Sequence, residues 1–388
     1  MRIKIAILGS TGSIGKTTVK IIKKNLKDFN VVLLSTNNKV KKIFKQAIEL
    51  NVKNVIIINK NKYLKNKKYF QRNKIKVYHD HSDIKKIIKK KIDYTMCSIS
   101  GLSGLKPTLE AIKLSKTVGI ANKESIICAW NLINKSLKKN NTTFIPIDSE
   151  HFSMWSLINS CKNHDIEEVI LTASGGPFLK KTKKDLININ PKEAIKHPNW
   201  SMGKKISIDS ATLMNKVFEV IEGQRIFDIE RRKFKILIHP NSYVHAIIKF
   251  NNGLVKFLAH DTNMTIPIFN SIYFKKNKNL STKKINFKIL NDLKLSHPDI
   301  NKFPSLNILK KIPNKNSLFE TVLISANDEL VNLYLKRKIK YSNIYTNLLK
   351  IINLKEFKKF SNKTPEDFKQ ISNLMEQVRL KTRYLCIK

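Results

Sequence analysis

The chain has 388 residues, of which 41% are hydrophobic, so it is long enough to form two or three domains with a sizeable core. Its formal net charge is +45, but only eight of its 74 basic residues are arginine, and the lysines are scattered through every segment. This scatter is typical of a codon bias towards Lys, Asn and Ile. It argues against a nucleic-acid partner, which would bind one concentrated basic stripe, although the positive potential would attract anionic substrates and cofactors.

Four cysteines are present, at Cys97, Cys128, Cys161 and Cys386. They are far apart in sequence and form no C-x-x-C pair, so the pattern predicts neither a zinc site nor a disulfide framework. No apolar run approaches the roughly 18 residues that a membrane span requires, and the first strand pattern begins at residue 3, which leaves no room for a signal peptide. We therefore expect a soluble, cytoplasmic protein that has no membrane partner.

The first informative motif is a glycine-rich turn. An apolar strand pattern over residues 3–8 meets Gly9, Gly12 and Gly15, and helical spacing follows over residues 19–26. Glycines permit a tight turn and the close approach of a pyrophosphate, whose charge then faces free amides at a helix start. The motif predicts a dinucleotide site, and the alternative is an ordinary turn between a strand and a helix.

The second predicted strand, over residues 31–34, indicates which dinucleotide is bound. A site for NAD would place a carboxylate after this strand to hold the ribose hydroxyls. The segment Ser35-Thr-Asn37-Asn38-Lys39 instead offers hydroxyls, amides and one cation. These groups suit a ribose that carries a 2′-phosphate, so NADPH is the predicted cofactor.

Hydrophobic periodicity predicts an α/β protein with three domains. Residues 1–150 alternate helices with strands, as in a Rossmann-like doubly wound parallel sheet, with strands over 31–34, 55–58, 94–99, 117–120 and 143–147. Residues 151–285 predict a central α+β catalytic domain, with strands over 169–173, 235–239, 246–250 and 253–258. Residues 286–310 read as a polar linker, and residues 311–388 as a C-terminal helical domain.

Carboxylates are scarce, with 29 in the chain, so paired ones stand out. Asp148 and Glu150 follow an apolar run, and strand periodicity would place both on one side, at the sheet edge where open α/β proteins bind ligands. Their oxygens could hold Mg²⁺ or Mn²⁺. The alternative is a helix cap and a first-turn acid that precede a helix over residues 151–157.

A second acidic segment spans residues 209–222. Helical spacing puts Leu213, Val217 and Ile221 on one face and Asn215, Glu219 and Glu222 on the other. In one interpretation this polar face is solvated and Lys216 pairs with an acid one turn away. In the other, Glu219 completes a three-carboxylate metal site, while Ser210, Asn215 and Lys216 hold an oxyanion.

Two loops have compositions suited to ligand binding. Ser174-Gly-Gly-Pro-Phe178 follows a predicted strand and gathers amides and a hydroxyl, which fits a phosphate loop or a plain turn. His197-Pro-Asn-Trp200-Ser-Met202-Gly203 fits a loop that closes over a ligand. The alternative is a surface loop in which Trp200 belongs to the core.

The chain resembles the 1-deoxy-D-xylulose 5-phosphate reductoisomerase family. Besides the glycine turn, the two acidic segments and the two loops, the resemblance rests on these motifs: Gly104-Leu-Lys-Pro-Thr108, Ala121-Asn-Lys-Glu-Ser125, Asp148-Ser-Glu-His151, Met214-Asn-Lys216 and His239-Pro240 with His245. They occur in family order up to about residue 270, and Ala326-Asn-Asp-Glu329 extends the match more weakly.

The resemblance implies rearrangement of a ketose phosphate, followed by reduction with NADPH to 2-C-methyl-D-erythritol 4-phosphate, a step of non-mevalonate isoprenoid precursor synthesis. It also implies a homodimer and a divalent metal ion (Mg²⁺, Mn²⁺ or Co²⁺). The metal would stabilise the alkoxide or enolate as a Lewis acid, and a flap would exclude water.

The resemblance also assigns roles by position. The implied metal ligands are Asp148, Glu150 and Glu219, and the implied phosphate ligands are Ser174, Ser210, Asn215 and Lys216. Substrate contacts would come from Lys123, Ser149 and His197, with Trp200 and Met202 on the flap. The implied cofactor contacts are Thr11, Gly12, Ser13, Ile14, Asn37, Asn38, Lys39, Asn122, Glu124 and Gly203. The implied catalytic residues are Lys123, Glu150, His197 and Glu219.

Two segments depart from the family pattern. Asn37-Asn38-Lys39 stands where the family usually has Gly-Lys-Asn or Gly-Arg-Asn, and Thr262-Asn-Met-Thr265 replaces a usual Pro-Asp-Met-Arg. The first departure bears on how the 2′-phosphate is contacted, and the second on packing or the dimer contact. The main alternative function is another NADPH-dependent Rossmann oxidoreductase, such as a homoserine-type dehydrogenase, and the non-enzyme alternative, nucleic-acid binding, rests on charge alone.

Overall fold

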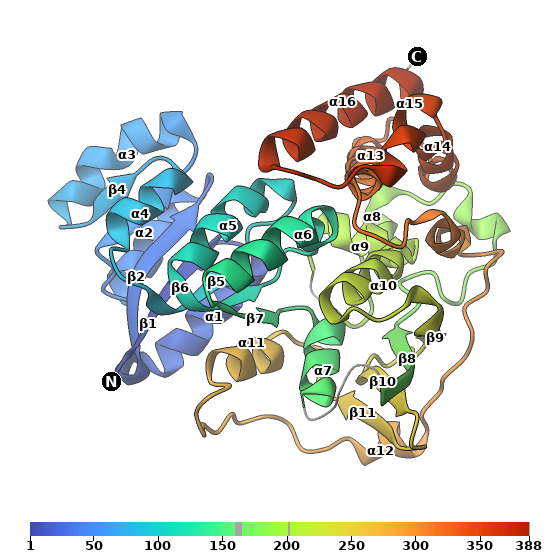
Figure 1. The fold of residues 1–388 in the computed structure, drawn as a ribbon, viewed down its shortest axis with the longest axis horizontal. Coiled ribbons are helices and arrows are strands. Elements are labelled where there is room, and N and C mark those ends of the chain that lie inside the picture. The colour runs from blue at the N-terminus through green and yellow to red at the C-terminus, as the bar shows by residue number, and fades with distance from the viewer. Residues whose placement is uncertain (160–164, 201, 388) are drawn as a thin grey trace. The chain divides into compact units, whose positions relative to one another are not determined.

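The computed structural model describes residues 1–159, 165–200 and 202–387 (Figure 1). The chain forms two compact units. The first comprises Met1–Ser125, Ile133–Phe152 and Met264–Ser281, and the second comprises Ile126–Leu132, Ser153–Asn263 and Thr282–Lys388. The domain boundaries expected from sequence stay a prediction.

The first unit is built on a seven-stranded parallel sheet in the order β4-β3-β2-β1-β5-β6-β7. Its strands are β1 (Ile3–Leu8), β2 (Phe29–Thr36), β3 (Asn54–Ile57), β4 (Lys76–Tyr78), β5 (Ile92–Cys97), β6 (Ser115–Ile120) and β7 (Thr143–Pro146). The predicted α/β class is therefore confirmed. The short edge strand β4 was not predicted, because its three residues carry too little periodicity.

Strand order reverses at β1, which places the ligand crevice of such a sheet at the carboxyl ends of β1 and its neighbours. The helices that follow these strands are α1 (Ser13–Lys24), α2 (Val40–Glu49), α3 (Lys60–Arg72), α4 (Ile84–Ile87), α5 (Leu105–Lys113), α6 (Lys123–Lys139) and α7 (Ser149–Ile158). The later helix α11 (Thr265–Ile272) also belongs to this unit, where Ser271 bonds the buried Tyr94 hydroxyl of β5 at 2.9 Å.

The second unit contains a four-stranded mixed sheet in the order β11-β10-β8-β9. Its strands are β8 (Ile166–Ala173), β9 (Phe234–Ile238), β10 (Val244–Phe250) and β11 (Val255–Ala259). Strand β8 pairs in parallel with β9 and antiparallel with β10. Leu171 and Ile248 from this sheet share one apolar cluster with Val220 and Phe227, which lie on α10 (Met214–Phe227) of the same unit. This packing against the sheet positions α10.

The helices of the second unit are α8 (Pro191–Ala194), α9 (Lys204–Ala211), α10 (Met214–Phe227), α12 (Phe287–Asn291), α13 (Leu318–Leu335), α14 (Ser342–Ile352), α15 (Lys355–Lys358) and α16 (Phe368–Cys386). The carboxyl-terminal stretch is helical, as expected. Within the described residues, no helix is both long and apolar enough to cross a bilayer. Cys97, Cys128 and Cys386 are free thiols, whereas Cys161 and Ser201 lie outside the described residues.

The helical spacing expected for residues 213–222 is present in α10, which begins at Met214. The break before it was not predicted: α9 ends at Ala211, and Leu213 adopts a left-handed backbone conformation with φ of 57°. The solvated-face interpretation was wrong, since Glu219 and Glu222 are each only 1% exposed. Charged side chains are rarely buried unless they have partners, so the burial of Glu219 and Glu222 indicates that this face of α10 has a role other than contact with solvent.

Candidate active site

The glycine-rich turn connects β1 to α1 as expected. Gly9 has φ of +84°, and a side chain there would come within 2.8 Å of the Ser98 carbonyl oxygen after β5. A side chain at Gly15 would collide with the Gly9 carbonyl. Gly12 precedes α1, and no side chain caps this helix. Its first amides, at Ser13 and Ile14, can therefore donate to a pyrophosphate.

The end of β2 is tied to the glycine turn by hydroxyl groups. Gly9 N–H donates to Ser35 Oγ at 2.9 Å, and the hydroxyls of Thr11 and Thr36 lie 2.7 Å apart. The following residues 37–39 are exposed. The structure thus brings the predicted pyrophosphate turn and the predicted 2′-phosphate segment together.

Two further predicted site residues, Lys123 and Asp148, lie at the starts of α6 and α7. The Lys123 ammonium pairs with Asp148 Oδ2 at 3.1 Å, and both follow neighbouring parallel strands, β6 and β7. The Asn122 side chain caps α6 and donates to the carbonyls of Ile99 and Gly101, so it holds the loop after β5. The predicted cofactor residue Glu124 follows in the first turn of α6.

The strand-periodicity argument for Asp148 and Glu150 was wrong. The backbone N–H of Glu150 donates to Asp148 Oδ1 at 3.1 Å, and Glu150 occupies the first turn of α7, as the helix-cap alternative proposed. Ser149 Oγ donates to Glu150 Oε2 at 2.5 Å. This placement keeps both carboxylates at the carboxyl edge of the sheet, so one argument for a metal site is lost and the site stays a prediction.

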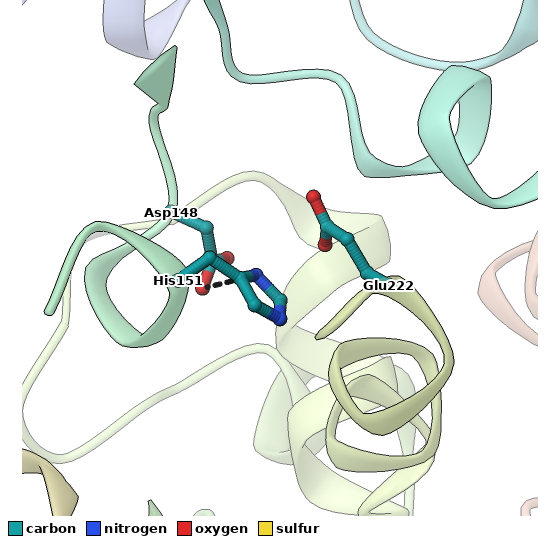
Figure 2. A group of neighbouring side chains, drawn as sticks. All are labelled: Asp148, His151 and Glu222. Carbon is teal, nitrogen blue, oxygen red and sulfur yellow. Dashed lines mark ion pairs between the residues drawn. The ribbon is translucent and has the colours of Figure 1, made fainter. Parts of the chain in front are cut away.

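Sequence analysis assigned no role to His151, although it contacts the predicted metal ligand Asp148. Figure 2 shows its imidazole in an ion pair with Asp148 at 3.4 Å, and also draws Glu222 of α10, a buried carboxylate of the second unit. Burial raises the pKa of Asp148, but the nearby Lys123 and His151 outweigh it, so the pKa lies well below its usual value. The three-residue spacing of Asp148 and His151 at a helix start was the available signal.

In the second unit, the loop after β8 meets the end of α9. Gly176 has φ of +67°, and a side chain there would come within 2.9 Å of the Ser210 carbonyl oxygen. Gly176 N–H also donates to Ser174 Oγ at 3.1 Å. Glycine therefore allows the predicted phosphate residues Ser174 and Ser210 to be carried on backbone segments in close contact.

Helix α10 carries the remaining predicted phosphate residues of the second unit. Lys216 is only 5% exposed, and its ammonium donates to the Thr172 carbonyl at 2.6 Å and pairs with Glu219. The Asn215 amide donates to the same Glu219 carboxylate. Sequence analysis proposed this ion pair as the alternative to a metal site. It is present, but it is buried, which the solvated-face interpretation did not foresee.

His197, in the predicted flap, is held in one tautomer. Its Nδ1 accepts hydrogen bonds from the N–H groups of Asn199 at 3.1 Å and Trp200 at 3.0 Å. Its Nε2 therefore carries the proton and donates to Ser174 Oγ at 3.0 Å. Burial lowers the pKa of His197 to about 4, and the Lys216 charge adds to this effect. Trp200 is partly buried, with its ring 6.1 Å from that of His245.

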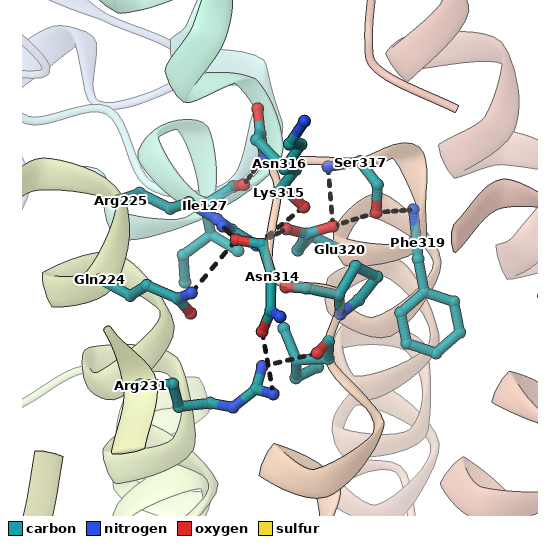
Figure 3. Close-up of polar contacts among 12 residues, drawn as sticks. Ile127, Gln224, Arg225, Arg231, Asn314, Lys315, Asn316, Ser317, Phe319 and Glu320 are labelled. Carbon is teal, nitrogen blue, oxygen red and sulfur yellow. Dashed lines mark hydrogen bonds and ion pairs between the residues drawn. The ribbon is translucent and has the colours of Figure 1, made fainter. Parts of the chain in front are cut away.

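The far end of α10 is anchored by a polar cluster that sequence analysis did not find (Figure 3). Arg225 pairs with Glu320 and donates to the carbonyls of Pro313, Asn314 and Lys315. Glu320 also accepts from Ser317, which caps α13. This cluster fixes the helix that carries Asn215, Lys216 and Glu219.

Comparisons with known proteins identify the family. Models described as "1-deoxy-D-xylulose 5-phosphate reductoisomerase", its "C-terminal domain" and the "DXP reductoisomerase C-terminal domain" match residues 5–130, 144–227 and 260–381. A relative of that name from Pelagibacter ubique is 54% identical over 97% of this chain and 98% of its own length. The chain belongs to the 1-deoxy-D-xylulose 5-phosphate reductoisomerase family. A relative of the same name from Clostridium novyi is 35% identical over 98% of this chain and 99% of its own.

Solved reductoisomerase structures share the fold. The enzyme from Zymomonas mobilis, solved in complex with NADPH, is 29% identical, with a TM-score of 0.88 over 100% of this chain and 99% of its own. A reductoisomerase in complex with NADPH, fosmidomycin and magnesium is also 29% identical, with a TM-score of 0.91 over 98% of each chain. The family is one of NADPH-dependent oxidoreductases, which confirms the predicted enzyme class, and the homoserine-type dehydrogenase alternative is not favoured.

Proposed function

We propose that this chain converts 1-deoxy-D-xylulose 5-phosphate into 2-C-methyl-D-erythritol 4-phosphate, with NADPH as the reductant. The observation that carries the proposal at residue level is the convergence of residues 174–176 with the end of α9 in the second unit. Ser174 supplies a hydroxyl and its loop surrounds it, and the buried Lys216 ammonium lies at the end of the preceding strand. Together these groups suit the phosphate of a ketose phosphate.

The phosphate ligands would be Ser174, Ser210, Asn215 and Lys216. Lys216 follows the buried start of α10 and points to the end of β8, directly before Ser174. Binding energy from this end of the substrate would orient the reacting carbons.

The metal ligands would be Asp148, Glu150 and Glu219. The donor set fits a hard dication, because Mg²⁺ and Mn²⁺ prefer carboxylate oxygens. When bound, such an ion supplies Lewis-acid stabilisation of negative charge on the substrate oxygens. Lys123 holds Asp148 in its ionised form, and Asn215 and Lys216 orient the Glu219 carboxylate.

The flap would be formed by His197, Trp200 and Met202. The hydrogen bond from His197 Nε2 to Ser174 links this segment to the phosphate loop. Phosphate binding at Ser174 can therefore be coupled to closure of the flap and exclusion of water. Ser149 and Lys123 would complete the substrate contacts.

The cofactor would lie along the carboxyl edge of the first unit's sheet. Thr11, Gly12, Ser13 and Ile14 would meet its pyrophosphate, and Asn37, Asn38 and Lys39 its 2′-phosphate. Asn122, Glu124 and Gly203 would contact the remainder. When bound, NADPH supplies the hydride for the reduction step.

The decisive assay follows NADPH oxidation by the purified chain, given 1-deoxy-D-xylulose 5-phosphate with and without Mg²⁺. Metal-dependent oxidation is expected, and its absence would refute the proposed activity. In Glu219→Gln, turnover should be abolished and Mn²⁺ affinity weakened, while NADPH binding stays largely intact. Glu230→Gln, which changes a carboxylate whose side chain is 61% exposed, is the matched control. Normal activity in Glu219→Gln would remove Glu219 from the metal site.

We also propose that the chain is a homodimer located in the cytoplasm. The edge strand β11 and its preceding loop expose Leu254, Val255 and Phe257, each at least half exposed. An apolar sheet edge of this kind invites pairing with another chain.

A further inference from the structure

Three lysines gather where α1 and α2 begin. Lys39 precedes α2, and Lys42 and Gln46 follow it at three- and four-residue spacing, so all three share one face of the helix. The direction of this face is fixed by Gln46, which is 5% exposed and bonds Ser10 of the glycine turn at 2.8 and 3.0 Å. Lys42 therefore lies one turn from a residue that contacts the nucleotide turn.

The third lysine, Lys16, lies in the first two turns of α1. Partial desolvation lowers the pKa of the largely exposed Lys42, and the nearby charges of Lys16 and Lys39 lower it further. Across the described part of the chain, these three ammonium groups have no acidic partner, whereas nearby Lys45 lies 4.0 Å from Glu49. Repulsion of this kind is relieved when an anion binds between the charges.

Neighbouring features favour a compact anion as the occupant. The N-termini of α1 and α2 carry no side-chain cap, and the first amides of α1, at Ser13 and Ile14, present positive partial charge. The last residues of β2, Ser35 and Thr36, supply hydroxyls and no carboxylate. A carboxylate there would repel a phosphate and would favour an unphosphorylated ribose.

We propose that Lys16 and Lys42, together with Lys39, bind the 2′-phosphate of NADPH and set the preference for NADPH over NADH. The inference rests on the proposed NADPH-dependent function and extends it to two residues outside the motifs of the family resemblance. It also accounts for the Asn37-Asn38-Lys39 departure. Lys16 and Lys42, each supplied by a helix start, provide positive charge where the family's Gly-Lys-Asn segment has a cation.

The test measures dissociation constants of NADPH and NADH by nucleotide fluorescence, without substrate or metal. Lys42→Ala and Lys16→Ala should each raise the constant for NADPH by about tenfold, because each loses a charge-assisted hydrogen bond, and should leave that for NADH nearly unchanged. Lys42→Arg should retain most of the affinity. Lys45→Ala, on the same helix but directed at Glu49, is the matched control. Both lysines are exposed, so these variants should fold.

A second measurement separates the phosphoester from free phosphate. 2′,5′-ADP should displace NADPH from the wild type much better than 5′-AMP does, and this advantage should shrink in the double variant Lys16→Ala/Lys42→Ala. Inorganic phosphate should compete only weakly. If the variants lost affinity equally for NADPH and NADH, or lost affinity for neither, the inference would be overturned while the proposed activity would be unaffected. Failure of the wild type to bind NADPH would overturn both.

Discussion

Arg225 and Glu320 form an ion pair of 2.6 Å although they lie 95 residues apart in the chain. Their side chains are only 5% and 0% exposed. Burial raises the pKa of Glu320 even though Arg225 opposes this change. The pair joins α10, which carries the proposed phosphate and metal ligands, to the start of α13.

Removing either partner should destabilise the protein strongly. Arg225→Ala or Glu320→Ala leaves a buried charge uncompensated, which costs about 3–5 kcal/mol of unfolding free energy. Urea unfolding followed by circular dichroism measures the change. Glu167→Ala, which breaks an exposed pair with Lys249, should cost about 1 kcal/mol or less. Similar losses in both pairs would contradict the proposed anchoring role.

Stability should fall as the pH drops from about 6.5 towards 4, partly through His197. The pKa of His197 is about 4 in the folded chain, so between pH 6.5 and 4 the unfolded chain binds a proton that the folded chain does not. The contribution of His197 to the free energy of unfolding is therefore complete above about pH 6.5 and is lost as the pH falls towards 4. Protonation at Nδ1 would also break its bonds with Asn199 and Trp200. Unfolding at pH 7.5 and pH 5 should show a smaller difference in His197→Asn than in the wild type. The same difference in unfolding free energy between the two pH values in both proteins would exclude His197 as a source of the pH dependence.

The glycine turn should tolerate a methyl group at one position and not at another. Gly15→Ala places its side chain against the backbone of Gly9 and Ser10, and should cost about 1–3 kcal/mol and displace the turn. At Gly12 the new atom would lie 3.3 Å from its nearest neighbour, the Gly9 carbonyl, and φ is −76°, so Gly12→Ala should cost much less. Thermal unfolding compares the two variants. A reversed order would show that the turn has a different conformation.

Charge on β11 should disrupt the proposed dimer. Phe257 is 50% exposed on this edge strand, and Phe257→Lys would bring like charges together in a paired edge. Light scattering should give twice the chain mass for the wild type and the single-chain mass for the variant. Leu64→Lys, at an exposed apolar residue of α3, should leave the mass unchanged. A monomeric wild type would refute the dimer.

Local sequence patterns were sufficient for the architecture of the first unit. Period-two apolar runs and glycine spacing act within about ten residues, so they predict β1, the turn and α1 without knowledge of the remaining chain. The same locality explains why one helix break was not foreseen and why one carboxylate was misplaced. The break at Leu213 depends on a left-handed residue inside an apparently continuous helical pattern, and the placement of Glu150 depends on where a strand ends and a helix begins.

The residue types of the candidate site were readable from the sequence, because phosphate and metal chemistry require particular side chains close to strand ends. Their environments were not readable. Burial of Glu219, the anchoring of α10 by Glu320 and the approach of Lys16 to Lys42 each join segments that are distant in sequence. Such contacts exist only once the chain is packed, since desolvation and charge proximity depend on through-space distance and not on position along the chain.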